Sequence, residues 1–151
     1  MSELLKEAIE TIGKKVQKSE SLLAEFSDED LDLLYSIAFS LYEQNDYKSS
    51  KEIFRQLVLA KPMERKNWLA LAGALQMGRD YQEALTAWGI SALYDDHDPL
   101  PHFHAAECLF SMENQEEGEK ALSAAEARME EENSDLSDKI NALRRGWNSL
   151  I

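Results

Sequence analysis

A pattern that returns every 34 residues constrains the fold of this chain more than any other feature. Most equivalent positions carry apolar or small side chains in three successive copies, with no insertion between copies. The sets are Leu34, Trp68 and His102; Ile37, Leu71 and Ala105; Ala38, Ala72 and Ala106; Leu41, Leu75 and Leu109; Tyr47, Tyr81 and Gln115; Ser50, Ala84 and Gly118; and Phe54, Trp88 and Leu122. A fixed period of this length is typical of stacked helical hairpins, because one hairpin cannot bury its apolar face alone.

Breaks in the apolar pattern divide each copy into two helices. Turn-forming residues fall at 44–46, 78–80 and 113–114, and Pro62 and the stretch 95–99 close the first two pairs. Ser27, followed by three acidic residues, is typical of a helix N-cap. No alternating β-branched run competes, so the sequence predicts an all-α, right-handed superhelix of three hairpins. The expected helices span residues 28–43, 47–60, 64–77, 81–93, 100–112 and 115–130.

The two ends of the chain carry further helical stripes outside the repeats. Residues 1–26 form an expected N-terminal helical segment, which either docks back on the domain or meets another chain; its stripe is Leu5, Ile9, Ile12 and Val16. Residues 27–151 form the expected repeat domain. A helix that starts near Ser134 is expected to cover its last apolar face, with the stripe Leu136, Ile140, Leu143 and Trp147.

The composition argues against several classes of function. With 16 Lys and Arg against 29 Asp and Glu, the formal charge is −13, which disfavours binding to nucleic acid or to anionic membrane surfaces. The single cysteine, Cys108, excludes an intramolecular disulfide. The N-terminus has no apolar core of a signal peptide, and no apolar run reaches the length of a membrane helix. A cytoplasmic location is expected.

A second apolar row distinguishes the first repeat helix from a helix that serves only the core. Tyr35, Phe39 and Tyr42 recur at the i, i+4, i+7 spacing, rotated away from the core row. The same positions in the later copies are Leu69, Gly73 and Gln76, then Phe103, Glu107 and Phe110. Such residues are expected to stack along the concave side of the superhelix, where tyrosine suits recognition. Packing against the N-terminal helix is the alternative interpretation.

Catalytic and metal sites have little support. His102, His104, Glu107 and Cys108 lie close in sequence, but the i, i+2 spacing directs the two histidines to different helix faces. His102 occupies the core register, which favours a packed histidine, and Cys108 is expected to be a small buried residue. No phosphate loop, carboxylate pair or catalytic triad is visible. We therefore expect no metal, no cofactor and no enzymatic activity.

Two levels of family resemblance follow from these motifs. The run Trp-Leu-Ala-Leu-Ala-Gly at 68–73, followed by Tyr81, Ala84 and Trp88, resembles the tetratricopeptide repeat. The segments 34–42, followed by Tyr47, and 101–109 resemble the class II chaperones of bacterial type III secretion. The resemblance covers about residues 27–130. The chain departs from it at Ser50 and Gly118, where alanine is usual, and at Asp96, where a closing proline is usual.

The resemblance implies a function and a site. Chaperones of this family hold hydrophobic translocator proteins in the cytoplasm before export, with an extended translocator segment in the concave groove. Carried over by position, the groove residues are Tyr35, Phe39, Tyr42, Tyr47, Leu69, Phe103 and Phe110. The family's N-terminal helix forms a homodimer, which here falls on Leu5, Ile9, Ile12 and Val16. The alternative function is a general tetratricopeptide adaptor that binds a partner's peptide or C-terminal tail. The expected groove surface is mostly apolar, with Lys66 as one nearby cation, so a carboxylate would find little to pair with.

Overall fold

The fold was analysed in a computed structural model, which describes residues 3, 7, 23, 25–130 and 133–148. Within these ranges the chain forms seven α-helices and no strand. They are α2 (Asp28–Glu43), α3 (Tyr47–Ala60), α4 (Arg65–Met77), α5 (Tyr81–Tyr94), α6 (Leu100–Ser111), α7 (Gln115–Ala127) and α8 (Ser134–Asn148). The predicted N-terminal stripe, Leu5, Ile9, Ile12 and Val16, lies outside the described residues.

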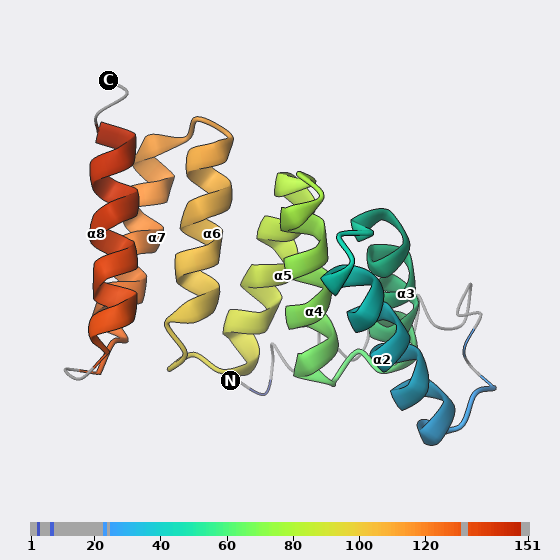
Figure 1. The fold of residues 1–151 in the computed structure, drawn as a ribbon. Helices are drawn as coiled ribbons and strands as arrows, with labels where there is room; N and C mark the ends of the chain where they lie inside the picture. The colour runs from blue at the N-terminus through green and yellow to red at the C-terminus, as the bar shows by residue number, and fades with distance from the viewer. Residues whose placement is uncertain (1–2, 4–6, 8–22, 24, 131–132, 149–151) are drawn as a thin grey trace.

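The helices pair into three antiparallel hairpins that stack in chain order, α2 with α3, α4 with α5, and α6 with α7 (Figure 1). Each hairpin packs on the next through its neighbouring helices, and α2 also reaches α4. Helix α8 packs against both α6 and α7 and ends the array. The prediction of an all-α stack of three tetratricopeptide-type hairpins with a C-terminal capping helix is therefore confirmed.

Local sequence explains where the helices begin and turn. Ser27 and Asp30 form a reciprocal capping box at the start of α2, as the sequence predicted for Ser27. The turn inside each hairpin contains one residue with a left-handed backbone, and these three residues are again 34 apart: Asn45 (φ 64°), Arg79 (φ 67°) and Glu113 (φ 63°). Asparagine adopts this conformation at low cost, whereas arginine and glutamate adopt it with strain.

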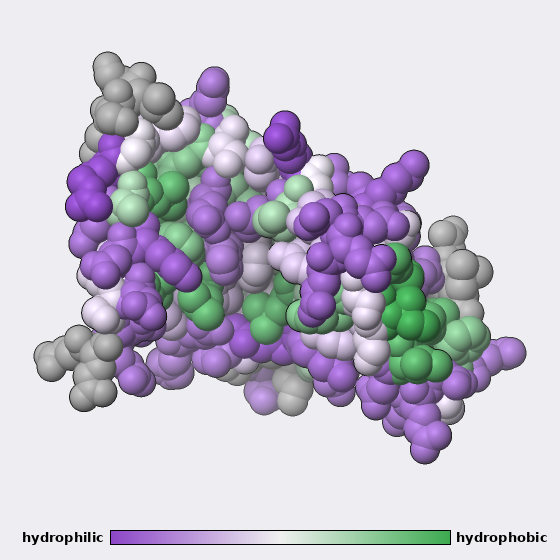
Figure 2. Space-filling view, in the orientation of Figure 1, coloured by the Kyte–Doolittle hydropathy of each residue, from purple (hydrophilic) through white to green (hydrophobic). Residues whose placement is uncertain are grey.

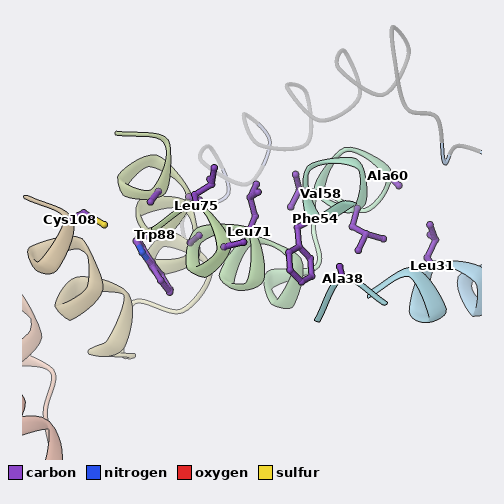
Figure 3. Close-up of a cluster of buried hydrophobic side chains, with 14 residues drawn as sticks. Leu31, Ala38, Phe54, Val58, Ala60, Leu71, Leu75, Trp88 and Cys108 are labelled. Atoms are coloured by element: carbon purple, nitrogen blue, oxygen red, sulfur yellow. The ribbon is translucent and has the colours of Figure 1, made fainter. Parts of the chain in front are cut away.

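Two hydrophobic clusters form the core. The larger cluster runs through α2 to α6 and includes Phe54, Leu71, Leu75 and Trp88 (Figure 3). The smaller cluster joins α6, α7 and α8; its buried members are Phe103, Ala106, Phe110, Leu122, Ala125, Leu136 and Ile140. Alanines 38, 72 and 106, one per repeat, are fully buried, so the hairpins approach closely at these points.

The predicted end of α7 was wrong. The expected helix 115–130 ends at Ala127, three residues early. The N–H of Arg128 bonds to the carbonyl of Ala125 rather than to that of Ala124, the α-helical acceptor. Its guanidinium bonds to the carbonyls of Ala124 and Asp96 and to the Asp96 carboxylate. A contact with a residue 32 positions away in sequence therefore ends the helix. The periodicity of apolar residues along the chain cannot predict such a long-range contact.

No helix among the described residues is long and apolar enough to cross a membrane.

Candidate functional site

The predicted binding row on α2 lines a hollow between the first and second hairpins. We call it the aromatic hollow; it encloses about 260 Å³ and is lined by Tyr35, Phe39, Tyr42, Phe54, Leu69, Ala70, Gly73 and Trp88. Four of the seven groove residues predicted from the sequence, Tyr35, Phe39, Tyr42 and Leu69, come together here. Its lining is mostly aromatic and aliphatic, the composition that ligand pockets usually have.

The aromatic rings of α2 form a continuous ladder. The ring centroids of Tyr35 and Phe39 lie 6.4 Å apart, and those of Phe39 and Tyr42 lie 6.1 Å apart. Tyr47, the fifth predicted residue, meets Tyr42 edge to face at 5.4 Å, although it does not line the hollow. Phe39 is 44% exposed, which is unusual for a phenylalanine that already has two aromatic neighbours. The ladder therefore presents apolar surface that helices α2 to α8 leave partly exposed.

Small and polar neighbours shape this surface. Gly73 faces Tyr42, and a Cβ added at Gly73 would lie 3.9 Å from that ring, in ordinary contact. Partial burial, and secondarily the neighbouring Tyr47, raises the pKa of Tyr42, so its hydroxyl stays protonated at neutral pH. The ammonium of Lys66 lies 4.9 Å from the centroid of the Tyr35 ring and 3.4 Å from the Asp32 carboxylate. The cation beside the hollow is thus already engaged by an aromatic face and a carboxylate.

Trp88 lines the aromatic hollow, although sequence reasoning assigned it only to the repeat core. Its indole N–H donates to Gln76 Oε1 at 2.9 Å, and its ring stacks on His104 with centroids 4.6 Å apart. These two contacts fix the orientation of a tryptophan that is 6% exposed. The 34-residue register equates Trp88 with Phe54, which lines the same hollow, and that correspondence was the available signal.

A polar bridge continues from Trp88 to α6. Gln76 Nε2 donates to Glu107 Oε1 at 3.1 Å, and His104 Nδ1 lies 2.6 Å from the same oxygen. Burial raises the pKa of the Glu107 carboxyl, but the bonds from His104 and Gln76 outweigh it and leave that pKa below its ordinary value. Glu107 is therefore ionised at neutral pH, and the bridge places one negative charge beside the apolar hollow.

A second hollow lies beyond this bridge, toward the C-terminal end of the stack. We call it the C-terminal hollow; it encloses about 460 Å³ and is lined by Gln76, Met77, Arg79, Tyr81, Glu107, Phe110, Ser111, Leu143 and Trp147. Phe110, the sixth predicted groove residue, is on its wall, packed against Trp147 at 5.3 Å between centroids. Phe103, the seventh, is 6% exposed in the smaller core cluster and lines neither hollow. Figure 2 shows hydrophobic surface gathered between α8 and α6.

The residues weighed as metal ligands are separated by their contacts. His104 is bound to Glu107 and stacked on Trp88, whereas His102 is half-buried elsewhere on α6. Burial, and secondarily the charge of Arg128, lowers the pKa of His102. Cys108 is fully buried, and this burial raises the pKa of its thiol to about 12. Among the described residues, no group of three or more His, Cys, Asp or Glu side chains could hold a metal ion.

Comparison with known proteins gave relatives both in sequence and in structure. No family model matches the chain. The low calcium response locus protein H of Yersinia pestis is 28% identical over 125 residues, which are 82% of this chain and 74% of that protein. Among solved structures, a chain of the CopN–Scc3 complex is 35% identical with a TM-score of 0.73, covering 80% of this chain and 72% of that one.

A second solved structure carries a functional description. The type III secretion chaperone SycD of Yersinia enterocolitica, crystallised with a peptide of the translocator YopD, is 26% identical with a TM-score of 0.75. The likeness covers 82% of this chain and 96% of that one. The identity, the coverage and the shared stack of hairpins agree with the motifs at 34–42 and 101–109. The chain belongs to the tetratricopeptide-repeat family of type III secretion translocator chaperones.

Proposed function

We propose that this chain is a chaperone that binds hydrophobic translocator proteins of a type III secretion system and keeps them export-competent. The observation that carries the proposal is the aromatic hollow, in which Phe39 remains 44% exposed beside Tyr35 and Tyr42. The relation to SycD, whose structure holds a translocator peptide, supports the class of ligand. A translocator segment that covers these rings removes apolar area from contact with water, which favours binding by about 25 cal/mol per Å² buried.

The chemistry of the site favours binding over catalysis. The aromatic hollow offers rings and aliphatic side chains, and the relatives are chaperones rather than enzymes. Ordering an extended segment offsets much of the apolar gain, so affinity is moderate and release needs no chemical energy from the chaperone. A general adaptor for C-terminal carboxylates is less well supported, because Lys66 is already paired with Asp32 and covers Tyr35.

The location and the assembly state are part of the proposal. A chaperone that meets its client before export acts in the bacterial cytoplasm. The stripe Leu5, Ile9, Ile12 and Val16 would form a homodimer contact, as the family resemblance implies. Sedimentation of the full chain and of residues 27–151 tests this contact. A full chain that is a dimer and a truncated chain that is a monomer would support it, whereas the same oligomeric state for both proteins would refute it.

The binding experiment compares two exposed apolar residues of α2. The translocator is first identified by tagged capture from the native bacterium and mass spectrometry, and its affinity is then measured by calorimetry. Phe39→Ala removes a ring of the aromatic hollow, and Leu33→Ala removes a side chain that is 61% exposed and lines none of the hollows described above. We expect Phe39→Ala to weaken binding about fivefold, which corresponds to roughly 1 kcal/mol of lost burial.

The control variant Leu33→Ala shows whether a loss of affinity in Phe39→Ala is specific to the aromatic hollow. Leu33→Ala is expected to bind like the parent, because its side chain lies outside the aromatic hollow. Equal affinity of the parent and Phe39→Ala, with both proteins folded by circular dichroism, would refute the assignment of this hollow. Capture of cytosolic proteins alone, held by their C-terminal tails, would instead favour the general adaptor.

A further inference from the structure

Two polar side chains interrupt the apolar row predicted for the concave side. In the 34-residue register, Gln76 stands where the first copy has Tyr42, and Glu107 stands where it has Phe39. Half-buried polar groups cost free energy unless new hydrogen bonds replace those lost to water. Both side chains are bonded here, and their bonds lead to Trp88 at the wall of the aromatic hollow.

The indole of Trp88 fixes the direction of every hydrogen bond in this series. An indole N–H only donates, so Gln76 must accept through its amide oxygen, 2.9 Å from Trp88 Nε1. The amide nitrogen of Gln76 then donates to Glu107 Oε1 at 3.1 Å. Because the Glu107 carboxylate accepts, His104 Nδ1, 2.6 Å from the same oxygen, carries the proton of their bond. Each group is therefore satisfied in one arrangement.

The series returns to Trp88 through the imidazole ring. His104 stacks on the indole with ring centroids 4.6 Å apart and an angle of 24° between the planes. Trp88 belongs to α5, yet Gln76 of α4 holds its N–H and His104 of α6 covers its ring. Since this ring is part of the wall of the aromatic hollow, a rotated indole would change the shape of the hollow.

We propose that Gln76 and Glu107 are positioning residues of the binding site, which hold the indole of Trp88 in the orientation that shapes the aromatic hollow for its ligand. The inference rests on the proposed function for the assignment of this hollow as the site. Neither residue lines the aromatic hollow, so both act through Trp88. A side chain that is already ordered loses less conformational entropy when a ligand binds, and this raises affinity. The third hairpin thus contributes to a hollow that residues of the first two hairpins line.

The chain without a ligand tests whether the bonds hold the indole. Gln76→Met keeps the length of the side chain and removes both of its hydrogen bonds. In proton–nitrogen NMR we expect the indole proton of Trp88 to move upfield in this variant. The indole proton of Trp68, which donates to the Pro62 carbonyl, should stay fixed. A Trp88 signal that does not move would overturn the proposal, because Gln76 would then not hold the indole.

An uncharged apolar dye, N-phenyl-1-naphthylamine, measures binding without any translocator. Its fluorescence rises in apolar sites, and the part of its binding that Phe39→Ala removes belongs to the aromatic hollow. We expect Gln76→Met to weaken this part about two- to tenfold, because the ligand then has to order one more side chain. An unchanged dissociation constant beside a moved Trp88 signal would overturn the proposal and leave the bonds a structural role alone. Equal dye binding by the parent and Phe39→Ala would instead overturn both the proposal and the assignment of the hollow.

Variants of Glu107 separate positioning from stability. Glu107→Gln keeps an oxygen that accepts from Gln76 and His104, so it should bind the dye like the parent. Glu107→Leu removes this acceptor and should weaken binding as Gln76→Met does. Asp98→Leu is the matched control, since it removes another half-buried carboxylate, which bonds to Arg65 of α4 at 3.0 Å and lines neither hollow. It should lower the free energy of unfolding without changing the dissociation constant. Equal losses of affinity in Asp98→Leu and Glu107→Leu would attribute the effect to stability and refute the positioning role.

Discussion

Gly118 gives the sharpest test of how the third hairpin is packed, because helix propensity and packing predict opposite signs. It lies inside α7, where alanine should stabilise a helix by about 1 kcal/mol relative to glycine. A Cβ at this position would lie 2.6, 2.7 and 2.9 Å from three ring atoms of Phe110. Real Cβ atoms essentially never approach so closely, so the ring or the helix has to move.

The ring has little room to move. Phe110 is 2% exposed and packs against Trp147 with centroids 5.3 Å apart. Adding a methyl group to such a packed core typically costs about 1–3 kcal/mol, which outweighs the gain in propensity. Subtracting the propensity gain from this cost, we expect Gly118→Ala to lower the free energy of unfolding by up to about 2 kcal/mol. Ring displacement would also enter the C-terminal hollow, since Phe110 lines it.

Urea unfolding followed by circular dichroism measures this effect, with Gly89→Ala as the matched control. Gly89 lies inside α5, and a Cβ there would meet nothing within 4 Å, so propensity alone acts and the variant should gain stability. The double change Phe110→Leu with Gly118→Ala should cost less than the sum of the single changes, because the smaller side chain relieves the clash. A stabilised Gly118→Ala, similar to Gly89→Ala, would refute the packing argument.

Three further predictions concern the thiol of Cys108, the half-buried His102 and the turns inside the hairpins. Because burial raises the pKa of Cys108 to about 12, iodoacetamide should fail to alkylate the folded chain at neutral pH and should react once urea unfolds it; fast reaction of the folded chain would contradict this. Burial lowers the pKa of His102 below the ordinary histidine value of 6.5, so the unfolded state binds more protons there than the folded state, and the free energy of unfolding should fall as the pH drops below 6.5. His102→Gln should reduce the slope of unfolding free energy against pH in that window, and an unchanged slope would exclude the histidine as its source. Glu113→Gly should raise the free energy of unfolding by up to about 1 kcal/mol by removing left-handed strain, whereas Asn45→Gly should change it less, and equal effects in urea unfolding would argue against strain at Glu113.

The repeat register made most helix boundaries predictable. Helices α2 and α3 begin and end at the predicted residues, because Ser27 caps the first and the turn at 44–46 separates the two. The register also repeats the left-handed turn residue in each hairpin. The end of α7 depends on Arg128 and Asp96, which meet only in the folded chain. The ion pair with Arg128 also gives Asp96 a structural role at the position where the family usually has a proline.

The candidate site was predictable only where it uses residues of the repeat row. Tyr35, Phe39 and Tyr42 share one face of α2, so their spacing was enough to bring them together. Phe103 and Phe110 occupy the equivalent positions of α6, yet they are buried in the cluster completed by Leu136 and Ile140 of α8. Helix α8 has no counterpart in the repeat, so the register does not predict what it covers. For the same reason the sequence did not predict that Trp147 lines the C-terminal hollow; its place in the stripe of α8 indicated only a packing role.

Charge and apolar surface have to be considered together in a chaperone of this kind. Before a client binds, the chain exposes Phe39, Met77 and Leu33 by 44, 50 and 61%. Such surface favours self-association, but a formal charge of −13 makes copies of the chain repel one another. At physiological ionic strength this repulsion extends only about 8 Å, so it acts mainly between copies that are nearly in contact. An extended, apolar segment without net charge does not meet this repulsion and is free to enter the hollows. The acidic surface therefore opposes self-association through the aromatic hollow, whereas the proposed homodimer contact uses a separate stripe, Leu5, Ile9, Ile12 and Val16.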